Sequence, residues 1–191
     1  MALLVLAISL TLSQLVLAAP DFCKNLECPQ YKVIQNFANY ELREYAPTVW
    51  VSVDTDRRSS SLAFRKLFDY IRGANNVEKS IEMTAPVLSS YSKDTMVMSF
   101  MVPSELSENP PTPNDADVYI QRVPRTQFYV RAFSPLFAPS YGTYSRQFRQ
   151  LKDDLIKDGN SYTVDPRFFT AGYDGPWTSS KDIMKYGSQK H

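Results

Sequence analysis

The sequence offers few reactive side chains. Its one histidine, His191, is the last residue, and terminal residues are usually poorly ordered. Serine–histidine and cysteine–histidine nucleophiles, histidine-based zinc sites and histidine-ligated haem all need a histidine inside the fold, so the sequence argues against each of them. None of the six glycines has the spacing of a phosphate-binding loop. The carboxylate pair Asp153 and Asp154 lies beside Lys152 and Lys157 and is interpreted as the charged face of a helix.

The only two cysteines, Cys23 and Cys28, lie close together. In an oxidising compartment such a pair most simply forms a disulfide. The loop that it closes is short, so the chain-entropy model gives a stabilisation of roughly 2 kcal/mol at most. We therefore predict that the bond staples an N-terminal arm, residues 19–30. A redox site would need Cys-x-x-Cys spacing, and a zinc site would need two further soft ligands that the sequence lacks.

The composition is rich in aromatic and thioether groups, with eleven Phe, twelve Tyr, two Trp and six Met. Most must form the core, but grooves with aromatic walls and a few basic residues at the rim suit flat amphipathic ligands that carry carboxylates. Tetrapyrroles are such ligands. A micromolar site needs about −8 kcal/mol, and a ligand of about 40 heavy atoms at about −0.3 kcal/mol per atom reaches about −12 kcal/mol by apolar contact. If the tetrapyrrole carries iron, a bond from a side chain to that iron is therefore optional.

Length and charge narrow the class of protein. A chain of 191 residues is long enough for one domain with a single core. Twenty-one basic and twenty acidic side chains give a net charge of +1, which argues against nucleic acid as a partner. We expect a monomer.

The first residues resemble a secretory leader. Residues 1–18 are uncharged and leucine-rich, and they end in a small-residue cleavage pattern, so we predict a signal peptide that is cut after Ala18. The protein is then secreted and has no stable insertion in a membrane. An apolar stretch of about nineteen residues could also span a bilayer as an uncleaved anchor. The sequence has no Asn-x-Ser/Thr glycosylation site to support secretion independently.

In the first half of the chain, apolar and polar residues first alternate as in strands and then follow the spacing of a helix. Val49, Val51 and Val53 share one face of a predicted strand at 48–53. Further strands are expected at 31–37, 40–45 and 95–102. Serines at 59–61 offer N-caps to a helix that Gly73 ends. The apolar residues at the spacing of one helix face, which we expect to face the core, are Phe64, Leu67, Phe68 and Ile71.

The second half repeats this order. Strands are expected at 118–123, 127–133, 162–164 and 167–173, with a helix at 141–157. In that helix Phe148, Leu151 and Leu155 correspond at a constant offset to Phe64, Leu67 and Ile71. A strand-rich unit with one helix, occurring twice, predicts a pseudo-twofold α+β domain over residues 31–191. The halves are residues 31–103 and 117–178, joined by the linker 104–116.

Four motifs in this order resemble the SOUL haem-binding family over residues 31–177. They are IEMTAPV at 81–87, FFTAGYDGPW at 168–177, YELREY at 40–45, and NPPTP at 109–113 followed by DVYI at 117–120. Because Pro86 lacks an N–H, the first of them is interpreted as a strand that bends or lies at a sheet edge. The resemblance implies a distorted antiparallel β-barrel flanked by two helices, and haem or another porphyrin as the ligand.

The resemblance also indicates where the family's functional positions fall. In one branch of the family, a histidine proposed as the axial haem ligand stands where this sequence has Glu44. In the other branch haem is thought to lie over the first helix with its propionates near basic groups. Two such positions correspond to Asp69 and Thr178, and the nearest basic residues are Arg65, Arg72 and Lys181.

We therefore predict a porphyrin groove without a histidine ligand, in which any axial bond comes from Tyr or Met. Its apolar walls would be Phe64, Phe68, Tyr173 and Trp177, with Arg65 and Arg72 as partners of the anionic groups. The alternatives are that Phe64 and Phe68 are simply core residues beneath the helix, and that Tyr173 and Trp177 belong to a structural turn.

These inferences favour a secreted, non-enzymatic protein that carries or sequesters haem or another tetrapyrrole. A second hypothesis is a small hydrolase or isomerase that uses Glu44 or Glu82, because the implied fold resembles bacterial effector-binding domains, some relatives of which are catalytic. A third is a protein-interaction module whose apolar groove binds a peptide or helix.

Overall fold

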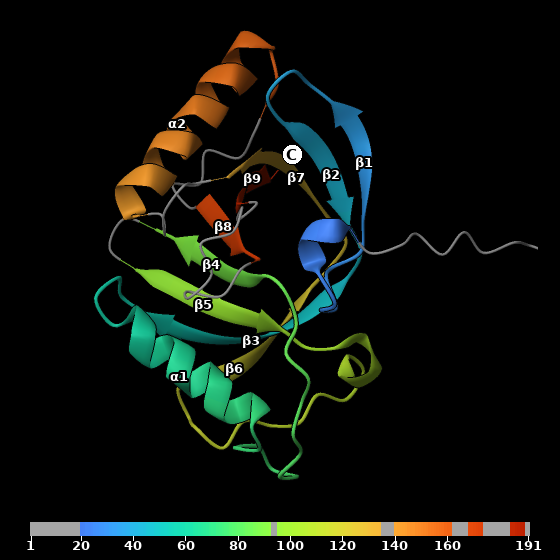
Figure 1. The fold of residues 1–191 in the computed structure, drawn as a ribbon, viewed down its shortest axis with the longest axis vertical. Coiled ribbons are helices and arrows are strands. Elements are labelled where there is room, and N and C mark those ends of the chain that lie inside the picture. The colour runs from blue at the N-terminus through green and yellow to red at the C-terminus, as the bar shows by residue number, and fades with distance from the viewer. Residues whose placement is uncertain (1–19, 93–94, 135–139, 162–167, 174–183, 190–191) are drawn as a thin grey trace, which may run out of the picture.

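The computed structural model describes residues 20–92, 95–134, 140–161, 168–173 and 184–189, the last range by its backbone alone. These residues form an α+β fold in which two helices pack on one antiparallel sheet (Figure 1). The helices are α1 (Ser60–Ile71) and α2 (Tyr141–Lys157), and two 3-10 turns are η1 (Asp21–Cys23) and η2 (Ser104–Leu106). The strands are β1 (Tyr31–Asn36), β2 (Glu41–Tyr45), β3 (Thr48–Thr55), β4 (Val87–Tyr91), β5 (Met96–Met101), β6 (Val118–Val123), β7 (Thr126–Phe133), β8 (Phe168–Gly172) and β9 (Met184–Gln189).

The strand order is β1-β2-β7-β9-β8-β4-β5-β3-β6, and every neighbouring pair is antiparallel. The sheet curves, so that β1, β2 and β7 stand apart from β3, β4 and β5 in Figure 1. Within the described residues the order ends at β1 and β6, which do not pair with each other. The α+β class is thus confirmed, whereas the closed barrel and the twofold repeat stay predictions.

Most strands lie where the alternation predicted them, with two differences. β9 was not expected, and it inserts between β7 and β8. The prediction for 81–87 was wrong: β4 begins only at Val87 and lies inside the sheet, between β8 and β5. Pro86 precedes the strand, where its missing N–H interrupts no ladder, and the Ala85–Pro86 peptide is cis. The strand predicted at 162–164 lies outside the described residues.

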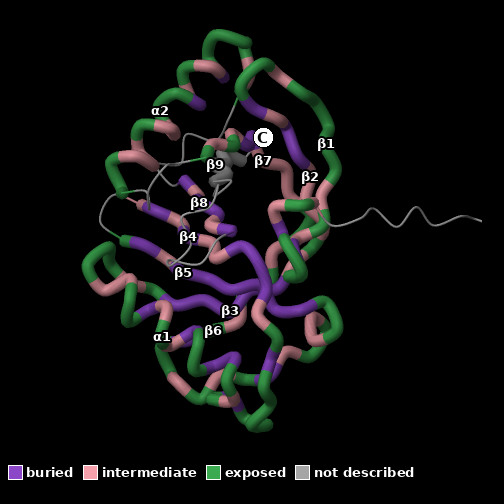
Figure 2. Tube along the Cα trace, viewed as in Figure 1, coloured by how far each residue is buried: buried purple, intermediate pink, exposed green. Residues whose placement is uncertain are grey.

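The main core lies between the sheet and the two helices. Val49, Val51 and Val53 all point into it, as their spacing predicted, and Leu67 of α1 is completely buried there. Figure 2 shows buried residues following β3, β4 and β5, and exposed residues along the outer sides of both helices. Within the described part of the chain, neither helix has the length and apolar character needed to cross a membrane.

The α1 helix differs in detail from its prediction. Ser59 occupies the N-cap position, but its side chain makes no capping bond; instead the Asp56 carboxylate accepts from the backbone N–H groups of Arg58 and Ser59 at 2.6 and 2.9 Å. Phe68 lies at the margin of the buried face and is 38% exposed. Tyr70 is buried instead, and its hydroxyl donates to the Pro111 carbonyl at 2.9 Å, which ties the 104–116 connection to α1.

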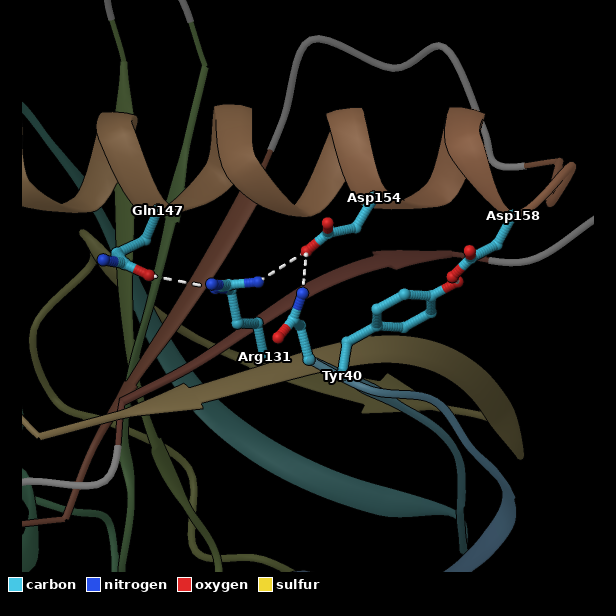
Figure 3. A network of polar contacts seen from close by, with 6 residues as sticks. Tyr40, Arg131, Gln147, Asp154 and Asp158 are labelled. Atoms are coloured by element: carbon cyan, nitrogen blue, oxygen red, sulfur yellow. Dashed lines mark hydrogen bonds and ion pairs between the residues drawn. The ribbon is translucent and has the colours of Figure 1, made fainter.

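Polar side chains fix α2 to the sheet (Figure 3). Arg131 of β7 donates to Asp154 at 2.7 Å and to Gln147 at 3.1 Å. Near the end of the helix, the Tyr40 hydroxyl donates to Asp158 at 2.8 Å. Burial raises the pKa of Tyr40 well above its ordinary range, and the bond to Asp158 raises it further. These contacts orient α2 so that its apolar side meets the sheet.

We expect Leu151→Ala in α2 to lower the free energy of unfolding by about 2–5 kcal/mol, because Leu151 is completely buried and its loss leaves a cavity. Ile156→Ala in the same helix is the matched control, since Ile156 is 66% exposed and should change stability by no more than about 0.5 kcal/mol. Urea unfolding of both variants measures the difference. Equal losses in the two variants would contradict the assignment of the core-facing side of α2.

Candidate functional site

The structure contains a cavity of about 560 Å³ on the face of the sheet turned away from the main core. Binding sites for small molecules typically have volumes of about 300–1,000 Å³. Successive residues of a strand point to opposite faces. The strand residues that line the cavity point to the face opposite the core. On β3, Trp50 lines the cavity while Val49 and Val51 enter the core; on β5, Ser99 lines it while Phe100 enters the core.

Aromatic side chains form much of the cavity wall. Phe128 of β7 makes edge-to-face contacts with Tyr45 and Phe169, with ring centroids 6.1 and 5.4 Å away. Trp50 is 6% exposed, and its indole N–H donates to the Thr48 hydroxyl at 2.8 Å. Such walls suit a flat apolar ligand, because aromatic rings offer large contact areas in fixed positions.

Most polar groups around the cavity already have partners. The Tyr119 hydroxyl donates to Asp54 at 3.0 Å, and burial, together with this bond, raises the pKa of Tyr119 to about 12. Arg122 donates from both terminal nitrogens to backbone carbonyls, to Ser107 at 2.7 Å and to Glu108 at 2.8 Å. These groups hold the wall in place and have little capacity left for a ligand.

Arg43 of β2 does not line the cavity, but it lies beside it and keeps one donor without a partner. It pairs in register with Phe128, which lines the cavity, so its side chain leaves the sheet on the cavity side. Arg43 is only 5% exposed. Glu41 accepts from its Nε at 2.6 Å and lies 2.5 Å from its Nη2, and the guanidinium lies 4.3 Å from the ring centroid of Tyr31. Its Nη1 is buried without a hydrogen-bond partner.

The N-terminal arm borders the cavity through Pro29. The predicted Cys23–Cys28 disulfide is present. Both cysteines are buried in a second cluster that includes Tyr173, whose ring makes an edge contact with Phe22 at 4.7 Å between centroids. Pro29, just after the arm's disulfide, lines the cavity. The arm therefore forms part of the cavity wall.

The structure separates the predicted site residues into two groups. Tyr173 lines the cavity, but Phe64 packs on Phe100 on the opposite face of the sheet, with ring centroids 5.2 Å apart. Phe68 stacks on Phe64 and lies under Arg72, whose guanidinium is 5.7 Å from the Phe68 ring. Arg65 and Asp69 are exposed on α1. Trp177, Thr178 and Lys181 lie outside the described residues.

Sequence reasoning missed the cavity walls formed by Tyr45, Trp50, Phe128 and Phe169. The signal was present in β3, where Trp50 interrupts the polar side of an alternating strand. A large aromatic residue on the side opposite three valines indicates a strand that is covered on both faces.

The two glutamates of the enzyme hypothesis lie outside the cavity. Glu44 accepts from Gln127 and Arg125, both at 3.1 Å, and these two bonds lower its pKa. Glu82 is exposed. Neither residue lines the cavity, which counts against a catalytic role for them. Among the described residues, no three His, Cys, Asp or Glu side chains gather as a metal site would require.

Comparison with known proteins finds similar sequences over most of the chain. The family model described as "SOUL heme-binding protein" matches residues 26–182. Heme-binding protein 2 of Mus musculus is 31% identical over 167 residues, which cover 80% of each chain. Heme-binding protein 2 of Homo sapiens is 33% identical over 149 residues, covering 72% of this chain and 71% of its own.

Solved structures share the fold at low identity. The crystal structure of the EcmrR C-terminal domain has a TM-score of 0.59 and 14% identity, and covers 84% of this chain and 98% of its own. A hydrolase from Listeria innocua has a TM-score of 0.53 and 9% identity, with coverages of 78% and 91%. At these identities the likeness extends to the fold alone.

The half-buried phenol of Tyr45 gives a pH prediction. Burial raises the pKa of Tyr45 to about 12, whereas an exposed tyrosine ionises near about 10. In the folded state, we expect Tyr45→Phe and the wild-type protein to have the same phenolate absorbance up to about pH 11. In urea, where the chain is unfolded, the variant should absorb less than the wild type near pH 10. Because the folded state binds this proton more tightly, its contribution to stability is complete below about pH 10 and is lost as the pH rises towards about 12. A decrease near pH 10 in the folded variant would contradict the raised pKa of Tyr45.

Proposed function

Because the chain belongs to the SOUL haem-binding family, we propose that it binds haem or another tetrapyrrole in the cavity on the sheet face opposite the helices. The observation that carries the proposal is the cavity itself, about 560 Å³ in volume and walled by Trp50, Tyr45, Phe128 and Phe169. A planar macrocycle gains affinity from such walls by apolar contact.

The residues around the cavity fit the two parts of such a ligand. The aromatic wall suits the macrocycle, and the open donor of Arg43 lies on the same face of the sheet for an acidic group. The only histidine of the sequence is its last residue, so we propose binding without a histidine ligand. Tyr45, Tyr119 and Tyr173 are the phenols that line the cavity. Bound haem would supply an iron centre, and these residues would bind and orient the ring.

We further propose that the protein is a secreted, monomeric carrier or scavenger and not an enzyme. The uncharged, leucine-rich leader supports secretion, although residues 1–18 lie outside the described residues. The disulfide of the arm is consistent with an oxidising compartment. The positions of Glu44 and Glu82 favour binding over catalysis. The volume of the cavity favours a small molecule over the peptide or helix of the third hypothesis.

In the same proposal the sheet is the family's distorted barrel, built from two related halves. The core positions support this relation. Leu67 and Ile71 are buried in α1 and Leu151 and Leu155 in α2, while Phe64 and Phe148 are partly buried beside them.

The surface of α1 is a second location for the same ligand. Phe68 and Leu62 are 38% and 53% exposed, and Arg72 lies over the Phe68 ring. This surface matches the position that the sequence predicted. None of these three residues lines the cavity, so we place this surface second.

Titration with hemin and with metal-free protoporphyrin tests the proposal. We expect the protein lacking residues 1–18 to bind both at micromolar concentration or tighter, with quenching of Trp50 fluorescence, because Trp50 lines the cavity. Ser90→Trp, which fills the cavity from β4, should weaken binding at least tenfold. Phe68→Ser, on α1, is the matched control and should not.

Three other outcomes have distinct meanings. Loss of binding in Phe68→Ser alone would move the site to α1. Binding of hemin without protoporphyrin would require a bond from the protein to the iron. Failure of the wild-type protein to bind either porphyrin would overturn the proposed function. The urea unfolding midpoint of each variant shows whether it is folded.

A further inference from the structure

Arg43 combines burial with an unused hydrogen-bond donor. Arg43 as a whole residue is 5% exposed. Its Nη1 is the one buried side-chain nitrogen or oxygen among the described residues that has no hydrogen-bond partner. Buried polar groups are nearly always hydrogen-bonded, and leaving one unpaired costs about 1–3 kcal/mol, more for a charged group. Such an atom indicates an interaction that the protein alone does not make.

The neighbours of Arg43 hold its guanidinium in one orientation. Glu41 engages Nε and Nη2 on one edge, at 2.6 and 2.5 Å. The Tyr31 ring covers one face of the guanidinium at 4.3 Å, and this ring in turn lies 5.4 Å from Tyr45. Nη1 points away from the occupied edge because a guanidinium is planar and its donors diverge. The remaining donor is therefore fixed before any ligand arrives.

Arg43 is not among the residues that line the cavity, but it lies next to Tyr45 and Tyr173. Both tyrosines line the cavity. Burial raises the pKa of each phenol, and Arg43 opposes this rise through its charge and, at Tyr45, also through a side-chain hydrogen bond. The ring of Tyr45 touches Phe128, the register partner of Arg43. Arg43 thus lies directly behind the aromatic wall.

We propose that Arg43 forms a carboxylate subsite at the Tyr45–Tyr173 end of the cavity. In this subsite Nη1 donates to a carboxylate oxygen of an amphipathic ligand whose apolar part fills the cavity. The inference rests on the proposed use of the cavity and adds the chemical class of ligand that it selects, an apolar or aromatic carboxylic acid. It does not depend on iron.

The charge balance favours one carboxylate in a fixed position. Glu41 offsets the charge of Arg43, so the subsite attracts an acid mainly through a directed, charge-assisted hydrogen bond. Arg122 also borders the cavity, but both of its terminal nitrogens donate to carbonyls, so it offers no equivalent donor. We therefore expect selectivity for acids to depend on Arg43 and not on Arg122.

The first test compares protoporphyrin with its dimethyl ester, which keeps the macrocycle and removes both carboxylates. We expect the wild-type protein to bind the acid at least tenfold more tightly than the ester. Replacing the pair together, Glu41→Gln with Arg43→Gln, avoids leaving Glu41 without its partner; it should abolish this preference and leave the affinity for the ester within about twofold. Arg122→Gln is the matched control and should keep the preference.

A second, smaller probe separates the subsite from porphyrin binding. We expect 2-naphthoate to bind the wild-type protein at least tenfold more tightly than 2-naphthamide in isothermal titration calorimetry, and the double variant to show no difference. If the double variant does not fold, Arg43→Lys serves instead. It keeps a positive charge beside Glu41 but lacks Nη1, and it should reduce the preference several-fold.

The outcomes separate the two proposals. Equal binding of porphyrin acid and ester to the wild-type protein would overturn the carboxylate subsite and leave the tetrapyrrole function standing. A second outcome is that the protein binds no porphyrin but binds 2-naphthoate more tightly than 2-naphthamide, with the difference lost in the double variant. This result would overturn the tetrapyrrole function and support the subsite. Equal or absent binding of both naphthalene probes, together with no porphyrin binding, would overturn both.

Discussion

The structure depends on one constraint, the covering of β3 on both of its faces. A strand must send alternate side chains to opposite sides, so β3 supplies the main core with Val49, Val51 and Val53 and the cavity with Trp50. Its neighbour β5 repeats the division, with Phe100 on the core side and Ser99 on the cavity side. Helix packing and ligand binding therefore use different residues of the same strands.

Burial on both sides makes the polar groups of these strands costly unless they are paired. The buried hydroxyls of Ser52 and Ser99 lie 2.8 Å apart and satisfy each other across the β3–β5 pair. Thr84 donates to the Met101 carbonyl at 2.8 Å. Against this background the open donor of Arg43 stands out, because the other buried side-chain nitrogens and oxygens of the described residues all have partners.

The sequence predicted the elements well because their signals are local. The valines of β3 and the apolar spacing of α2 each lie within one element, and short-range alternation or helical periodicity identifies them. The cavity depends on register and strand order, which bring Tyr45, Phe128 and Phe169 together from three strands. Tyr173 was assigned to a groove with Phe64, but no local pattern shows which face of the sheet a residue after β8 will meet. The residues of β9 were likewise not recognised as a strand, since their pairing partners lie in distant segments.

The position of β9 also has a consequence for how the molecule is made. β9 follows all other strands in the chain but lies between β7 and β8, and Phe128 and Phe169 of those two strands touch across it. A ribosome delivers the chain from its N-terminus, so the helices and the other eight strands emerge before the strand that joins the two sides of the cavity. Until β9 is released, the nascent protein has no complete aromatic wall. Ligand capture must then follow the release of β9, which separates the folding of the core in time from the acquisition of a binding site.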